Sequence, residues 1–192
     1  MTNYQEPSQE LVEPFVIAAH GDLARVQELL AQEPALLNVP WARFDETALQ
    51  AASHMGRRDI AEYLLGQGAP LNICTAAMLG SAEEVGAFLQ QDPTLSTAKG
   101  AHGIPVMYHA ALSGKPEVGD LLLAHGGGES MDGSLHAAVL SGKVEMVRWL
   151  LDNGVSDVNP PDFNGKTPRA MAEALGHTEI ADLLRERGGA TS

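Results

Sequence analysis

The organisation of this chain is clearest in residues 47–72, which read TALQAASHMGRRDIAEYLLGQGAPLN. The stretch begins with an Ala-rich segment that ends at Gly56, and it continues into an amphipathic run that ends just before Gly68. Similar segments return around Gly21, Gly80, Gly114, Gly142 and Gly176. Because self-similarity at such a period is typical of solenoids, the repeat predicts the architecture before any single residue does.

Each copy predicts two short antiparallel helices. In residues 47–72 the first helix has an inner face of small residues such as Ala51 and Ala52, and the second has larger ones such as Ile60 and Leu64 at helical spacing. A Gly at the end of each helix suits the positive φ that a chain reversal needs. Neither helix could bury its apolar face alone, so stability must come from stacking on neighbouring units.

The signature of a known family recurs in these copies. TALQAA at 47–52 returns as SLHAA at 134–138 and as TPRAMA at 167–172, and GAPLN closes one unit at 68–72. The pattern resembles the ankyrin repeat, with its T-P-L-H-x-A-A signature and G-A-D-V-N close. The resemblance covers residues 12–188. It implies an all-α solenoid of about six helix–turn–helix units with short hairpin fingers.

We therefore predict one ankyrin-repeat domain, residues 12–188, between a polar leader at 1–11 and a tail at 189–192. Its six units fall at about 12–37, 38–71, 72–96, 97–128, 129–156 and 157–188.

The spacing of the units alternates. Successive anchor glycines are 35, 24, 34, 28 and 34 residues apart, whereas the family period is ~33. The short steps leave the third and fifth units without a finger, while connections of full length remain at 38–46, 96–105 and 155–166. We expect three fingers separated by notches in the concave face.

Two glycines interrupt predicted second helices. Gly86 and Gly119 lie mid-way along them, where Gly costs about 1 kcal/mol relative to Ala. Close approach of a neighbouring helix would explain both.

Charge excludes some partners. The chain has 12 Lys and Arg residues against 25 Asp and Glu, a formal net charge of −13, and it has no basic run. Phosphate binding requires basic patches, so we expect neither nucleic acid nor a membrane surface as partner. The acidic excess is explained either by solubility or by a basic partner.

Location and assembly are expectations from composition. Cys74 is the single cysteine, which excludes an internal disulfide and fits a reducing compartment. The first ten residues do not form a signal peptide, and no apolar run approaches the ~20 residues of a membrane span. We expect a cytoplasmic monomer.

The seven histidines do not predict a metal site. His136 and His177 occupy family positions, His125 ends a second helix, and His109 takes an apolar place where a neighbouring carbonyl would satisfy it. Three residues remain, and none has a metal motif around it: His20, His54 and His102. Cys74, His109 and His136 fall on successive units roughly 10 Å apart, too far for zinc ligands. We predict no metal and no cofactor.

Evidence for catalysis is equally thin. A lone Cys on a helix face is usually a small core hydrophobe, and the glycines at 126–128 lack the Lys of a phosphate loop. We name no catalytic residue; whether the chain is an enzyme stays open, with a non-catalytic role favoured.

The resemblance implies a protein–protein interaction module that binds another protein or peptide through its concave face and fingers. Trp and Arg are enriched in binding hot spots, although Trp41 could instead fold onto its own unit. The predicted binding residues are Trp41, Arg43, Phe44, His54, Met55, Met78, Leu79, Lys99, His102, Tyr108, Leu112, Ser113, Leu140, Ser141 and Phe163. The alternative is a small-molecule binder or enzyme in the notched cleft beside the third and fifth units, using Trp41, Arg43, His54, His102 and Tyr108.

Overall fold

The computed structural model describes residues 6–128 and 131–191. Over these ranges it is built from paired α-helices and contains no β-strand, so the predicted all-α solenoid of six helix pairs is confirmed. The pairs are α1 (Gln9–Ala19) with α2 (Leu23–Gln32), α3 (Ala48–His54) with α4 (Arg58–Gly66), α5 (Ile73–Leu79) with α6 (Ala82–Gln91), α7 (Val106–Ser113) with α8 (Pro116–Ala124), α9 (Met131–Leu140) with α10 (Val144–Asn153), and α11 (Pro168–Ala174) with α12 (Thr178–Glu186).

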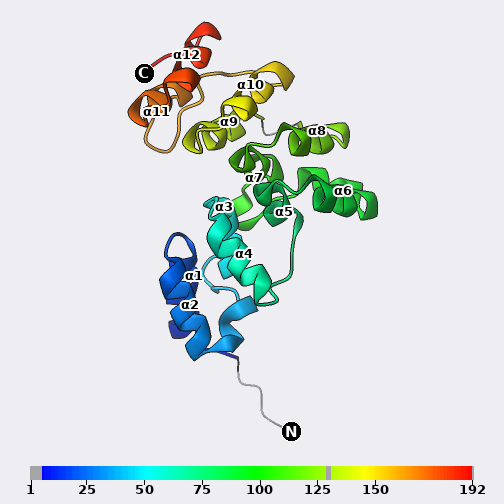
Figure 1. The fold of residues 1–192 in the computed structure, drawn as a ribbon, viewed down its shortest axis with the longest axis vertical. Helices are drawn as coiled ribbons and strands as arrows, with labels where there is room; N and C mark the ends of the chain where they lie inside the picture. The colour runs from blue at the N-terminus through cyan, green and yellow to red at the C-terminus, as the bar shows by residue number, and fades with distance from the viewer. Residues whose placement is uncertain (1–5, 129–130, 192) are drawn as a thin grey trace.

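The pairs follow one another along an elongated stack, with α1 and α2 at one end and α12 at the other (Figure 1). Three short 3-10 helices lie in the connections: η1 (Pro34–Asn38), η2 (Pro93–Thr97) and η3 (Ala101–Gly103). In the part of the chain that the structure describes, no helix is both long enough and apolar enough to cross a membrane.

Small residues on the first helices form the spine of the stack. Successive first helices contact one another from α1 to α11, and their alanines are buried without exception between α3 and α9: Ala48, Ala51, Ala52, Ala76, Ala77, Ala110, Ala111, Ala137 and Ala138. Because an Ala side chain ends at Cβ, neighbouring helices can approach closely here. Larger residues of the second helices, such as Leu64 and Leu122, fill the space behind them.

The helix ends follow from local sequence. Thr47 and Gln50 form a capping box at the start of α3, which satisfies backbone donors that the first turn leaves unpaired. Asn72 caps α5 directly by accepting from the Thr75 amide at 3.0 Å. Since Asn72 also closes the second unit, the third unit begins with no intervening finger. Gly80 and Gly114 end α5 and α7 at φ 71° and 74°, which a residue with Cβ rarely adopts.

Three reverse turns form where the connections are long. Trp41 pairs with Glu46 in finger one and Lys99 with Pro105 in finger two, while finger three closes when the Asp162 amide donates to the Lys166 carbonyl at 2.9 Å.

The third unit does not leave the notch that its missing finger predicts. Helix α3 contacts both α7 and η3, which belong to the fourth unit, so finger two lies across the position that a third-unit finger would occupy. The prediction of an open notch at the third unit is therefore wrong. With no finger between them, the second and fourth units meet directly.

The ends of the domain also extend beyond the predicted repeat. Helix α1 begins at Gln9, inside the predicted leader, of which residues 1–5 lie outside the described residues. In the predicted tail, Ala190 is tied to the last connection: its carbonyl accepts from Thr167 Oγ1 at 2.5 Å and its amide donates to Asn159 Oδ1 at 2.6 Å.

The two mid-helix glycines have different explanations. A Cβ at Gly119 would lie 2.6–2.9 Å from the Trp149 ring, whose Nε1 donates to Asp120 Oδ1 at 2.8 Å. Close packing therefore requires Gly at 119. A Cβ at Gly86 would meet nothing within 4 Å, so close approach does not explain Gly86, and nothing in the structure does.

This contrast gives a paired prediction. Gly86→Ala should stabilise the fold by about 1 kcal/mol because it gains helix propensity without a clash. Gly119→Ala should destabilise it by about 1–3 kcal/mol because the Trp149 ring must move. Urea unfolding followed by circular dichroism measures both; equal effects of the two substitutions would contradict the packing described here.

Candidate functional site

A groove of about 970 Å³ lies between finger two and finger three. It spans the fifth unit, the one whose missing finger leaves an opening. Its walls come from the end of α3, from finger two, from α7 and α9, and from finger three and α11: His54, Met55, His102, Ile104, Pro105, Tyr108, Gly133, Ser134, His136, Leu140, Pro161, Asp162, Phe163 and Met171.

Large apolar side chains remain exposed around this groove. Met55 is 49% exposed, Leu140 52%, and Phe163 has no protein cover at all, at 110% of its reference area. Clustered apolar side chains of this size on a surface mark an interaction site. The groove therefore has the character of a binding site for an apolar group.

Polar groups at the groove are held by the backbone. His136 Nε2 lies 3.2 Å from the Lys166 carbonyl in the next unit, the inter-repeat bond expected of that family position. Asp162 accepts from the Lys166 and Asn164 amides at 2.8 Å each, and hydrogen bonds with the Lys166 backbone are the largest cause that lowers its pKa. Finger three is thus a fixed wall of the groove.

The groove gathers six of the fifteen predicted binding residues: His54, Met55, His102, Tyr108, Leu140 and Phe163. The others lie outside it: Trp41, Arg43, Phe44, Met78, Leu79, Lys99, Leu112, Ser113 and Ser141.

Two of these residues are not on the surface. Met78 and Leu112 were predicted to contact a partner, but they are 2% and 7% exposed. The cause is the missing third finger, because direct contact between α3 and α7 covers the inner end of α5. Leu112 lies over Gly56, two units away, where a Cβ would be 3.6 Å from its side chain.

Finger one packs inward rather than projecting. Trp41 is half-buried against the core. This agrees with the alternative that Trp41 folds onto its own unit. Its ring centroid lies 4.9 Å from that of Phe44, and the Phe44 centroid lies 5.2 Å from that of His102. Gln9 of α1 holds the finger by accepting from the Ala42 amide at 2.8 Å. Fingers one and two therefore touch through Phe44 and His102.

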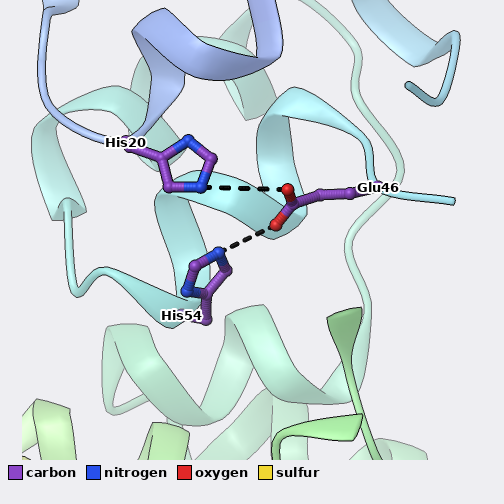
Figure 2. A group of neighbouring side chains, drawn as sticks. All are labelled: His20, Glu46 and His54. Atoms are coloured by element: carbon purple, nitrogen blue, oxygen red, sulfur yellow. Dashed lines mark hydrogen bonds and ion pairs between the residues drawn. The ribbon is translucent and has the colours of Figure 1, made fainter. Parts of the chain in front are cut away.

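Behind this contact, three histidines surround a buried carboxylate (Figure 2 shows two of them). Glu46 is fully buried. His54 Nε2 lies 2.8 Å from its Oε1, and His102 Nε2 lies 3.3 Å from the same oxygen. His20 Nε2 lies 3.8 Å from Oε2, which has no hydrogen-bond partner among the described residues. The cluster joins the ends of α1 and α3 to both fingers.

The histidines keep Glu46 ionised. Burial alone raises the pKa of this carboxyl, but the hydrogen bond from His54 and the charges of His54, His20 and His102 together outweigh it. The pKa of Glu46 consequently lies below its usual value. The hydrogen bond from His54 and the nearby imidazoles therefore favour the carboxylate form of Glu46.

The other side chains discussed for chemistry are structural. His109 is buried and its Nδ1 lies 2.9 Å from the Pro105 carbonyl, as expected. Gly100 of finger two covers both His109 and Cys74, because a Cβ there would meet them at 3.3 and 3.4 Å. Burial raises the pKa of the Cys74 thiol to about 12, so the thiol stays protonated at neutral pH and cannot act as a nucleophile.

Sequence reasoning singled out His20, His54 and His102 but missed Glu46. Its only signal was an acidic residue directly before the Thr47 cap, at the end of finger one. The equivalent residue in the last unit, Lys166, is exposed, so position in the repeat does not predict burial.

Comparison with known proteins agrees with this architecture. Ankyrin repeats in three copies match residues 73–160 and 107–191, and a single ankyrin repeat matches residues 44–76. The chain belongs to the ankyrin repeat family. Ankyrin repeats are generally protein-interaction modules.

Several relatives share part of the chain. Potassium channel AKT1 of Oryza sativa subsp. indica is 48% identical over 59 residues, which is 31% of this chain and 6% of the channel. Potassium channel AKT1 of Arabidopsis thaliana is 48% identical over 54 residues, 28% of this chain and 6% of that protein. Cyclin-dependent kinase inhibitor 2A of Homo sapiens is 30% identical over 127 residues, 62% of this chain and 78% of that protein.

The buried His109 predicts a dependence of stability on pH. Burial lowers its pKa from 6.5 to about 4, so between these values the unfolded chain binds a proton that the folded chain does not. The free energy of unfolding should fall by about 3 kcal/mol as the pH drops through this window.

In His109→Gln, urea unfolding between pH 7 and pH 4 should show a loss of stability smaller by about that amount. His125→Gln, at an exposed helix end, is the matched control and should keep the wild-type dependence. The same pH dependence in both variants would refute the role of His109.

Proposed function

We propose that this chain is a non-catalytic binding module that holds an apolar segment of a partner protein in the groove across its fifth unit. The observation that carries this proposal is the exposure of Met55, Leu140 and Phe163 around a groove bounded by two fingers. A solvent-exposed Phe and Leu are the kind of anchors that gain most when a partner covers them.

The groove fits a side chain from a partner better than a flat protein surface. Fingers two and three rise on either side of it, and the short connection into the fifth unit leaves the space between them open. A protruding segment can therefore enter where a broad surface would be stopped by the fingers. Arg43 and Lys99 lie outside the groove and are not proposed as contacts.

Charge favours a basic partner. The formal net charge of −13 creates a field that attracts cationic proteins and accelerates their association at low salt. We infer a segment with apolar anchors flanked by Lys or Arg, an association whose rate falls as salt is added.

The relatives support the class of partner only. The name of cyclin-dependent kinase inhibitor 2A gives a kinase as the target of that protein, so a repeat stack of similar extent acts on another protein. Identity between repeat proteins is concentrated in the signature positions that build the core. Such identity does not imply that the two proteins share a binding surface. For this chain we infer a protein partner and no particular kinase. A monomeric, cytoplasmic protein stays our expectation, from the single cysteine and the acidic surface.

A small apolar molecule is the second candidate. The volume of about 970 Å³ lies within the range of small-ligand sites. If the groove binds a small molecule, His54, His102 and Tyr108 would contact it. Trp41 and Arg43 belong to finger one and do not line the groove, so they would not contact the ligand.

Selection of peptides from a displayed random library on the intact protein tests the groove. Leu140→Asp and Phe163→Asp should each weaken binding of the selected peptides by at least about tenfold, because a charge replaces an apolar anchor. Fluorescence anisotropy with labelled peptide measures the affinities.

Leu11→Asp is the matched control, since Leu11 is 44% exposed on α1 and lies outside the groove; it should bind like the wild type. Peptides that bind all three variants equally would refute the proposal. If no peptide is selected while an apolar compound raises the melting temperature of the wild type and not of Phe163→Asp, the second candidate replaces the first.

A further inference from the structure

We propose that His20, Glu46 and His54 form a zinc site, with a fourth coordination position left for water. The sequence predicted no metal, because the residues weighed for it lie on separate units. The cluster here is different, because Glu46 at the end of finger one lies between His20 of the first unit and His54 of the second (Figure 2).

The distances suit one ion. The ligand atoms of His20, Glu46 and His54 all lie within 4.8 Å of one another. Zn–N and Zn–O bonds of about 2.0–2.2 Å place the ligand atoms of a tetrahedral site about 3.3 Å apart. His54 Nε2 lies 2.8 Å from Glu46 Oε1, and His20 Nε2 lies 3.8 Å from Glu46 Oε2. These two separations bracket that value.

Glu46 supplies the independent indication of a ligand. Its Oε2 is buried and has no hydrogen-bond partner within the described part of the chain, and a buried carboxylate oxygen left unpaired is costly. His20 Nε2 faces this oxygen at 3.8 Å, beyond hydrogen-bond distance. An ion between the two atoms would satisfy both.

The histidines are oriented for coordination. His20 Nδ1 lies 3.0 Å from the Val16 carbonyl. Because a carbonyl only accepts, Nδ1 donates to it, which leaves Nε2 as the nitrogen that faces Glu46 and that a metal would bind. Metal-bound histidines are characteristically fixed by such a bond from the other nitrogen. His54 is 10% exposed and lies edge-on to both His20 and His102, with ring centroids 5.1 and 5.2 Å away.

The donor set selects the ion. Two imidazoles and one carboxylate form a nitrogen-rich site of borderline softness, which suits Zn²⁺ over Mg²⁺ or Ca²⁺ because those ions prefer oxygen ligands. One bound ion would join the end of α1 to finger one and α3, and so lock the first and second units together. The groove shares His54 and His102 with this cluster, but His20 and Glu46 do not line it.

Titration of the full chain with Zn²⁺ after dialysis against chelator tests the site. The wild type should bind one equivalent with a micromolar or lower Kd, and Co²⁺ in its place should give the visible absorption of a four-coordinate ion. Glu46→Gln and His20→Gln should each weaken Zn²⁺ binding by at least about tenfold, and the rise in melting temperature that Zn²⁺ causes in the wild type should be lost.

His125→Gln is the matched control. His125 Nδ1 also lies 2.9 Å from the carbonyl four residues earlier, yet no carboxylate faces it in the described structure, so this variant should bind Zn²⁺ like the wild type. If Glu46→Gln does not fold, His20→Gln alone decides, because His20 lies at the partly exposed edge of the cluster. Substoichiometric binding to the wild type, or equal affinity of wild type and His20→Gln, overturns the proposal. Neither result bears on peptide binding at Leu140 and Phe163.

Discussion

The structure depends on close contact between neighbouring first helices. Each helix pair has too little apolar surface to fold alone, so stability comes from burying one pair against the next. Alanines at positions such as Ala52, Ala77 and Ala111 let the helix backbones approach, and the larger second helices spread apart behind them. The inner ends of the first helices and the fingers line one face of the stack, and this face holds the groove.

The length of the connections then decides what that face can do. A connection of full length forms a finger. No finger forms where Asn72 both closes one unit and caps the first helix of the next. The two missing fingers have opposite results. At the third unit the neighbouring units close on each other, burying Leu112 and bringing His102 to Glu46. At the fifth unit the space stays open and becomes the groove.

Local rules explain why the fold could be predicted from sequence and much of the site could not. Caps such as Thr47, chain-reversing glycines such as Gly80, and the alternation of spacing are all local properties that one sequence displays. Burial of Glu46 and Met78 depends instead on units two apart touching, which no single repeat encodes. The exposed groove residues Leu140 and Phe163 were found because they lie at positions that the repeat leaves variable.

The central claim is that the missing fifth finger creates the binding face. Hydrogen–deuterium exchange of the chain with and without a library-selected peptide tests it most directly, because it maps the contact without any substitution. The account predicts that peptide slows exchange at residues 102–108, 133–140 and 161–163, on both sides of the fifth unit. Protection confined to the second helices, α4, α6, α8 and α10, would contradict it.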